Sequence, residues 1–267
     1  MTVVAVASAK ASPGATTLAL ALAATWPAAG LTGGRAVVVE ADPDGGSLAA
    51  RFGLGYEPGL ASLAAAARHG LDEGTLFAHL QPLGARLWLL CGPASAQRAR
   101  IALTSAADRL ADRLSTLVDT AVVVDVGRLF TGSPALPLAR AAGVCLLVAR
   151  PRLDEVQHLA WRARALTDAG CRVGLVCVGD RPYPPVDVAA SAGLPLAGVV
   201  ADDARGAEAL CGSPARERVL RRLPLWWTAT ELSAALAVRL GGPGADATTN
   251  GRRPAATEVT TAPRGGR

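Results

Sequence analysis

A short loop near the N-terminus combines a glycine, two hydroxyl side chains and the single lysine of the chain. It reads Ala-Lys-Ala-Ser-Pro-Gly-Ala-Thr-Thr at positions 9–17, between an apolar run at 3–7 and a Leu/Ala-rich segment that is typical of a helix. A strand, a tight loop and a helix start form the layout of a phosphate site, in which backbone N–H groups and the positive end of the helix face an anion. The match to the standard phosphate-binding loop is partial, because alanine stands at 9 in place of glycine and at 15 in place of lysine.

Acidic side chains follow three other apolar runs. They are Glu40, Asp42 and Asp44 after 37–39, Asp125 after 121–124, and Asp180 after 173–178. Each acid by itself could be a turn or helix-cap residue. Together they favour a ligand site, because ligands in open parallel sheets bind beyond the carboxyl ends of the strands.

The loop resembles the deviant P-loop of the ParA/MinD ATPase family, K-G-G-x-G-K-T-[TS]. In that family a signature lysine near the start of the loop reaches across a dimer to the partner's nucleotide. Lys10 falls on the signature position and Gly14 on the last glycine of the motif. Thr16 matches the hydroxyl that coordinates magnesium, Thr17 is the next residue, and Ala15 occupies the position of the usual P-loop lysine.

Two acidic motifs extend the resemblance. The family's second strand ends in D-x-D, whose second acid places metal-bound or attacking water; Asp42 matches this acid, and Glu40 replaces the first one. The run that ends in Asp125 resembles the family's Walker B strand. The resemblance therefore implies that Asp125 holds Mg²⁺ through water, together with Thr16.

Two later segments agree in order and spacing. Residues 145–155 resemble the strand and helix start that precede the family's dimer-facing helix, and Asp180 stands where an Asn or Asp often contacts adenine. The resemblance covers about residues 1–240, and it implies a nucleotide site made of Lys10, Gly14, Ala15, Thr16, Thr17 and Asp180.

The departures from the motif weaken the expected chemistry. Ala15 cannot supply the ammonium group that meets the β- and γ-phosphates, and a lost charge-assisted hydrogen bond costs about 1.5–3 kcal/mol. Ala11 and Ser12 replace glycines, and Pro13 has no N–H to donate. The sequence predicts a weak ATPase at most, in which Lys10 supplies positive charge in trans or in cis.

The elements that position these residues alternate along the chain. Strands are predicted at 3–7, 36–40, 86–90, 121–125, 144–149, 173–178 and 196–200, and helices near 16–25, 59–68, 94–117, 134–141, 153–169, 186–192, 204–211 and 217–240. Continuous apolar strands separated by helices indicate an α/β fold, a doubly wound and mostly parallel sheet with helices on both faces. Within the resemblance, this is the P-loop NTPase architecture of the SIMIBI type.

Composition agrees with one large domain and a tail. The chain has 267 residues, 51% of them hydrophobic, and a formal net charge of +5, with 26 arginines and one lysine. Residues 1–240 are predicted to form the nucleotide-binding domain. Residues 241–267 are rich in Gly, Pro, Thr and Ala, contain four arginines and two acids, and are predicted to be a disordered tail.

Other features bear on localisation. The five cysteines are odd in number and lack C-x-x-C spacing, which is typical of a reducing compartment, and the three histidines lack metal-ligand spacing. Residues 11–34 are uncharged and superficially resemble a signal or anchor, but Pro13-Gly14, Pro27 and the strand-like run before Lys10 oppose that interpretation. We expect a cytoplasmic protein without an integral membrane segment, at a membrane only through a partner.

The leading hypothesis is an ATP- and Mg²⁺-binding protein that forms a homodimer over nucleotide. It would act with an unidentified protein partner as a switch for positioning or assembly, as in chromosome partitioning, septum placement or pilus and secretion localisation. Lys10 and Asp42 would carry any slow hydrolysis. A pseudo-ATPase scaffold that needs no nucleotide is the alternative. A DNA-partitioning motor has less support, from Arg216, Arg218, Arg221 and Arg222, which an ordinary solvated face also explains.

Overall fold

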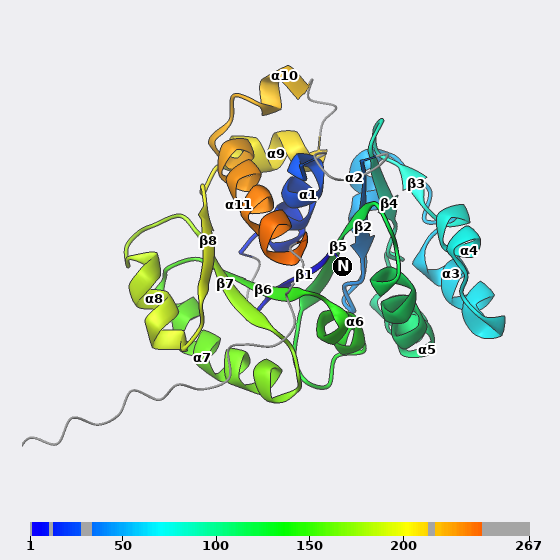
Figure 1. Cartoon of the computed structure of the whole chain (residues 1–267), viewed down its shortest axis with the longest axis horizontal. Coiled ribbons are helices and arrows are strands. Elements are labelled where there is room, and N and C mark those ends of the chain that lie inside the picture. The colour runs from blue at the N-terminus through cyan, green and yellow to red at the C-terminus, as the bar shows by residue number, and fades with distance from the viewer. Residues whose placement is uncertain (1, 11–12, 28–33, 213–216, 242–267) are drawn as a thin grey trace, which may run out of the picture.

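One eight-stranded sheet organises the molecule in the order β3-β4-β2-β5-β1-β6-β7-β8 (Figure 1). The computed structural model describes residues 2–10, 13–27, 34–212 and 217–241. The parallel strands are β1 (Val3–Ser8), β2 (Arg35–Glu40), β4 (Leu87–Leu90), β5 (Thr120–Arg128), β6 (Val144–Ala149), β7 (Val173–Val178) and β8 (Leu196–Val200). The short β3 (Gln81–Pro82) pairs antiparallel with β4. Because β1 lies between β5 and β6, the loop after β1 begins in the interior of the sheet.

Alternate residues of each inner strand enter two different cores. Val3, Ala5 and Ala7 pack into the core on one face of the sheet, whereas Val4 and Val6 pack into the core on the other. β-Branched residues that are buried on both faces are typical of parallel strands covered by helices.

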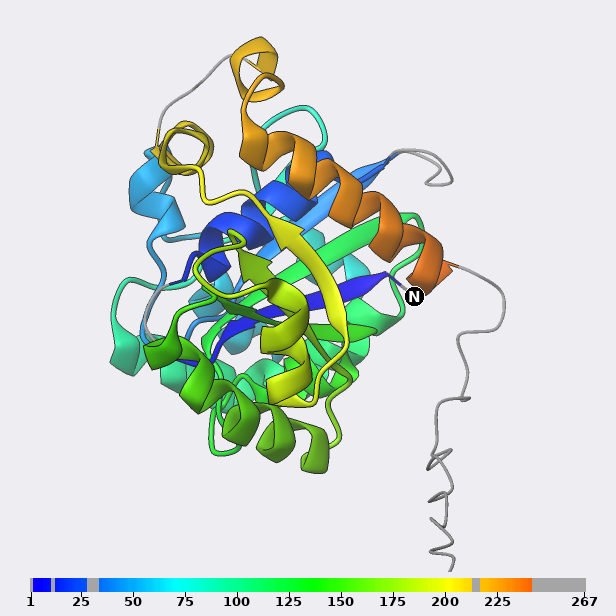
Figure 2. The same cartoon turned by 90° about the vertical axis from the view of Figure 1, so that its left-hand side faces the viewer.

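Helices cover both faces of the sheet, as Figure 2 shows in side view. One core receives α1 (Ala15–Thr25), α2 (Leu48–Phe52), α9 (Ala204–Gly212) and α11 (Pro224–Gly241). The other receives α3 (Leu60–Ala66), α4 (Glu73–Ala78), α5 (Ala96–Ser115), α6 (Leu136–Ala141), α7 (Leu153–Asp168) and α8 (Pro185–Ala192). The 3-10 turn η1 (Ala67–His69) follows α3, and the short α10 (Glu217–Leu220) precedes α11. The predicted doubly wound α/β fold is confirmed.

Three differences from the predicted elements have local causes. The helix predicted at 217–240 is divided, because α10 ends at Leu220 and α11 begins at Pro224, whose missing N–H suits a first helical position. The sequence pattern did not predict β3, α2 or α4, which are each six residues or shorter. α4 begins at an Asp72 cap that accepts a hydrogen bond from the Thr75 amide at 2.6 Å, a local signal that the prediction missed.

Burial and length settle two expectations about the described residues. All five cysteines are free and buried, which is typical of small core residues. Within the described ranges, no helix combines the length and the apolar character that crossing a membrane requires. The predicted tail from 242 onward and Arg216 lie outside the described residues.

Candidate nucleotide site

The loop after β1 leads into a helix whose first amides have no side-chain cap. Gly14 occupies the N-cap of α1 with φ 103°, in the left-handed region that favours glycine, and its carbonyl accepts the first helical bond from the Leu18 amide at 2.8 Å. Ala11 and Ser12 lie outside the described residues. An uncapped N-terminus of an 11-residue helix, directly after a central strand, is suited to face an anion.

Asp125 is a buried carboxyl group with an unsatisfied oxygen. It lies in β5, where Oδ1 accepts a hydrogen bond from the Gly127 amide at 3.1 Å, while Oδ2 has no hydrogen-bond partner among the described residues. Burial raises the pKa of Asp125 to about 7; the nearby Thr16 hydroxyl and the hydrogen bond from the Gly127 amide favour its charged form, and the charges of Asp42 and Glu40 oppose it. A cation next to this carboxylate would relieve the cost of its burial.

Glu40, which stands where the family has an aspartate, joins separate loops. Its Oε1 accepts hydrogen bonds from the amides of Ser47 at 2.6 Å and Leu48 at 2.9 Å, and its Oε2 accepts one from the Gly92 amide at 3.0 Å. Burial raises the pKa of Glu40, and these three backbone bonds lower it. The carboxylate thus fixes the loops after β2 and β4, and its oxygens are already occupied by the chain.

Asp42 is half-buried beside Asp125. Its Oδ1 accepts a hydrogen bond from the Asp44 amide at 2.8 Å, and burial is the main cause that raises its pKa. Gly127 has φ 60°, and a side chain at this position would overlap the Asp42 carboxylate. Since Glu40 and Asp125 are also register partners across β2 and β5, the structure brings Asp42 and Asp125 together at one edge.

Lys10 is exposed and points toward α7. Its Nζ lies 3.1 Å from Nε2 of His158 on that helix. On the same helix, the Arg162 guanidinium donates a hydrogen bond to the Ala9 carbonyl at 3.5 Å. The sequence prediction missed Arg162 because one arginine among 26 carries no positional signal.

Of the other residues predicted for the nucleotide site, some line a cavity at the start of α1 and others do not. The Ala15 side chain is buried in the core under α1, and Thr17 contacts Cys211 of α9, whose Sγ lies 3.5 Å from Thr17 Oγ1. Gly14 and Thr17 line a cavity of about 350 Å³, together with Pro13, Leu18, Arg150, Val178, Val200, Ala201, Asp202, Asp203, Ala204, Ala207 and Leu225. Asp180 is exposed after β7 and does not belong to this lining.

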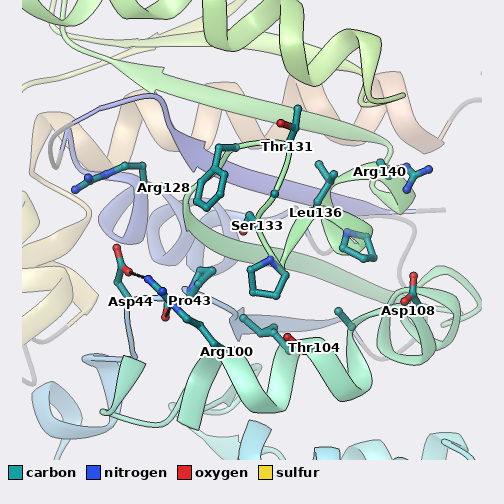
Figure 3. A pocket seen from close by; sticks show the side chains of 16 residues that line it. Pro43, Asp44, Arg100, Thr104, Asp108, Arg128, Thr131, Ser133, Leu136 and Arg140 are labelled. Atoms are coloured by element: carbon teal, nitrogen blue, oxygen red, sulfur yellow. Dashed lines mark hydrogen bonds and ion pairs between the residues drawn. The ribbon is translucent and has the colours of Figure 1, made fainter. Parts of the chain in front are cut away.

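A larger groove, of about 730 Å³, lies between α5 and the segment after β5. Pro43 and Asp44, in the loop after β2, form part of its lining. Figure 3 shows Arg128 on the same side of this groove as Asp44. Arg100 of α5, which also lines this groove, forms an ion pair with Asp44 in the loop after β2, with Nη2 2.9 Å from Asp44 Oδ1. Asp44 is thus engaged with α5.

The oxygen donors present fit a hard cation. Across the described ranges, no three His, Cys, Asp or Glu residues are grouped so that they could hold a metal ion by themselves. Mg²⁺ commonly binds to one or two protein oxygens and completes its shell with water and phosphate. The Thr16 hydroxyl and the unsatisfied Asp125 Oδ2 are oxygen donors of this kind.

Comparison with known proteins adds the fold relationship. No family model matches the sequence, and no curated protein matches it either. Among solved structures, a ParA family ATPase from Chlorobium tepidum TLS is similar with a TM-score of 0.74 and 16% identity, over 87% of this chain and 98% of that one. The septum site-determining protein MinD from Pyrococcus horikoshii OT3, complexed with Mg-ADP, is similar with a TM-score of 0.60 and 17% identity, over 90% and 95%. A McdA variant from Cyanothece in complex with ATP is similar with a TM-score of 0.64 and 17% identity, over 89% and 96%.

Proposed function

We propose that this chain, which has a ParA/MinD-like fold over most of its length, binds ATP with Mg²⁺ and acts as a dimeric switch for positioning or assembly. The observation that carries the proposal is the buried Asp125 carboxyl group, whose Oδ2 lacks a partner among the described residues and whose other interactions include Thr16 at the start of α1. An anion site and a cation site therefore adjoin.

Each residue has a distinct role in the proposal. The amides that follow Gly14 bind phosphate, and Thr16 and Asp125 hold Mg²⁺, which neutralises phosphate charge when bound. Asp42 orients water near Asp125, as its position against Gly127 allows. Since Ala15 supplies no ammonium group, hydrolysis is slow or absent.

The nucleoside would occupy the cavity of about 350 Å³ that begins at Gly14 and Thr17. Besides residues of the loop and α1, its lining includes the last residues of β7 and β8 and residues that follow β6 and β8. In the sheet order these strands lie on the other side of β1 from β2 and β5, which carry or precede Asp42 and Asp125. Among the similar structures, one MinD is described as complexed with Mg-ADP and one McdA variant as complexed with ATP, which supports a nucleotide here. Asp180 would contact adenine only if its loop moved toward the cavity.

The exposed face of α7 supports the dimeric part of the proposal. Trp161 is 79% exposed and Leu153 is 66% exposed on this helix, and His158, which contacts Lys10, lies on the same side. Large exposed apolar residues beside a functional loop favour a protein contact. A second copy on this face would cover Trp161 and receive Lys10 near its nucleotide.

Calorimetric titration of ATP and Mg²⁺ into the full chain tests the binding proposal. We expect saturable heat that depends on Mg²⁺, because Thr16 and Asp125 need the ion between them and the phosphates. Thr16→Ala should remove the Mg²⁺ dependence, while Thr167→Ala, an exposed threonine of α7, should bind as the unchanged protein does. Absence of both heat and a thermal shift at millimolar ATP contradicts the proposal.

That negative outcome would favour the second candidate, a nucleotide-independent scaffold. The observation that favours it is Ala15, a buried methyl where the motif has an ammonium group. A DNA-partitioning role depends on Arg218 and on the 221–222 arginines near α10. A DNA mobility shift that weakens steeply with salt would support that role, since phosphate contacts release counterions.

A further inference from the structure

Two arginines approach the first residues of the phosphate loop from opposite sides of β1. Arg128 ends β5 and is the register partner of Ser8, and the next amide, of Leu129, donates a hydrogen bond to the Ser8 carbonyl at 3.3 Å. Arg162 belongs to α7, which follows β6 on the other side of β1, and its Nη2 lies 3.5 Å from the Ala9 carbonyl oxygen. The Arg162 guanidinium therefore contacts the start of the loop, and the Arg128 backbone is paired with Ser8, the residue before it.

These two guanidinium groups repel each other, and the charge of Arg128 also acts on the Asp42 carboxylate without an ion-pair contact. Among the described residues, neither Arg128 nor Arg162 forms an ion pair, whereas Arg98, Arg100, Arg150 and Arg164 each do. Partial burial lowers the pKa of Arg162, and the charge of Arg128 lowers it further. Two neighbouring guanidinium groups that repel each other at a partly buried position are stabilised when an anion binds between them.

The surroundings indicate which part of a nucleotide these groups would meet. Arg128 follows Asp125 by three residues and acts electrostatically on Asp42, so it lies on the acidic side of the loop. The cavity proposed for the nucleoside begins at Gly14 and Thr17, at the other end of the loop. A nucleotide with its base in that cavity would extend its last phosphate toward the arginines.

We infer that Arg128 and Arg162 bind the terminal phosphate of a nucleoside triphosphate and replace, within the same chain, the lysine that is missing at position 15. This inference rests on the proposed function. A planar guanidinium group can donate two parallel hydrogen bonds to phosphate oxygens, so the pair would make the site selective for ATP over ADP. Lys10 remains available for the partner copy, because its Nζ contacts the outer face of α7 at His158.

Calorimetric affinities for Mg-ATP and Mg-ADP test the inference. Arg162→Gln keeps a donor for the Ala9 carbonyl and removes the charge; Arg128→Ala removes the second guanidinium. We expect each variant to bind ATP about tenfold more weakly or worse, and ADP within about twofold of the unchanged protein, because only ATP carries the terminal phosphate. Arg164→Ala, on the same helix and paired with Asp168, is the matched control and should change neither affinity.

The outcomes separate this inference from the function on which it rests. If the unchanged protein binds both nucleotides and Arg162→Gln weakens them equally or not at all, the inference is overturned and the proposed nucleotide site stands. If the unchanged protein binds neither nucleotide, both are overturned. Arg162→Lys should restore part of the ATP preference, whereas a purely structural role through the Ala9 carbonyl would leave the ATP-to-ADP ratio unchanged in every variant.

Discussion

The carboxyl group of Asp125 links protonation to folding, because it is buried with one unsatisfied oxygen among the described residues. Its pKa is raised from 3.8 to about 7, mainly by burial. Between these two pH values the folded chain holds a proton that the unfolded chain has released. The free energy of unfolding therefore falls as the pH rises through this window, and this contribution levels off above about pH 7.

Asp125→Asn should raise the free energy of unfolding at pH 8 by about 1–3 kcal/mol, because it removes an uncompensated buried charge. At pH 4 the difference should largely disappear, since the aspartate is then protonated in the folded state. Urea denaturation at the two pH values, without nucleotide or metal, measures both numbers. Asp112→Asn, at an exposed position of α5, is the control.

The proposed metal role of Asp125 predicts that nucleotide reverses which protein is more stable, the unchanged chain or Asp125→Asn. Mg-ATP should stabilise the unchanged protein, which then overtakes Asp125→Asn, because ligand binding adds to the stability of the folded state only. A variant that loses stability at pH 8 in the absence of ligand contradicts the electrostatic account. Equal stabilisation of both proteins by Mg-ATP contradicts the metal role.

α7 brings three kinds of side chain to one region: the cation Arg162, the Lys10 partner His158 and the exposed apolar Trp161. The helix can do this because only one stripe of it, which includes Leu159, Ala163 and Leu166, is buried against the sheet. In the proposed dimer, the opposite face, which carries the exposed Trp161, would receive the second copy of the chain. α7 thus connects the phosphate loop to the proposed dimer interface.

Trp161→Ala and Lys10→Ala should each weaken the dimer that forms with Mg-ATP by about tenfold or more, because one removes buried interface area and the other a charge across the interface. Neither should change the free energy of unfolding by more than about 0.5 kcal/mol, since both side chains are exposed. Analytical ultracentrifugation with and without Mg-ATP provides the measurement. Trp227→Ala, an exposed tryptophan of α11, should dimerise normally; an unchanged dimer in the Trp161 and Lys10 variants would exclude this face.

The whole molecule shows which features of a site can be read from local sequence. The seven parallel strands were predictable because each is a continuous apolar run, and their parallel order places Asp42 and Asp125 at one edge without further information. The short elements α2 and α4 were missed because so few residues make no period. Such elements become stable through tertiary contacts, such as those of Leu48 and Leu76 with the two cores.

The side chains that surround the phosphate loop were predictable only in part. Lys10 was conspicuous because it is the single lysine, but its contact with His158 joins positions 148 residues apart. Arg128 and Arg162 become conspicuous only when packing places them beside Ser8 and Ala9. Glu40 was visible in the sequence as a replacement of the first aspartate of the D-x-D motif, but its structural role was not. That role is to accept hydrogen bonds from three backbone amides.

The hydrogen bonds to Glu40 couple the local unfolding of the loops after β2 and β4. The amides of Ser47 and Leu48 lie at the start of α2, and that of Gly92 lies after β4, in a distant part of the chain, yet all three donate to one carboxylate. Exchange of an amide proton for deuterium requires its hydrogen bond to open. We expect the three amides to become exchangeable together, with one shared opening free energy, and to lose their protection together in Glu40→Ala. Hydrogen–deuterium exchange followed residue by residue by NMR would show this; three independent rates would mean that the loops after β2 and β4 open separately.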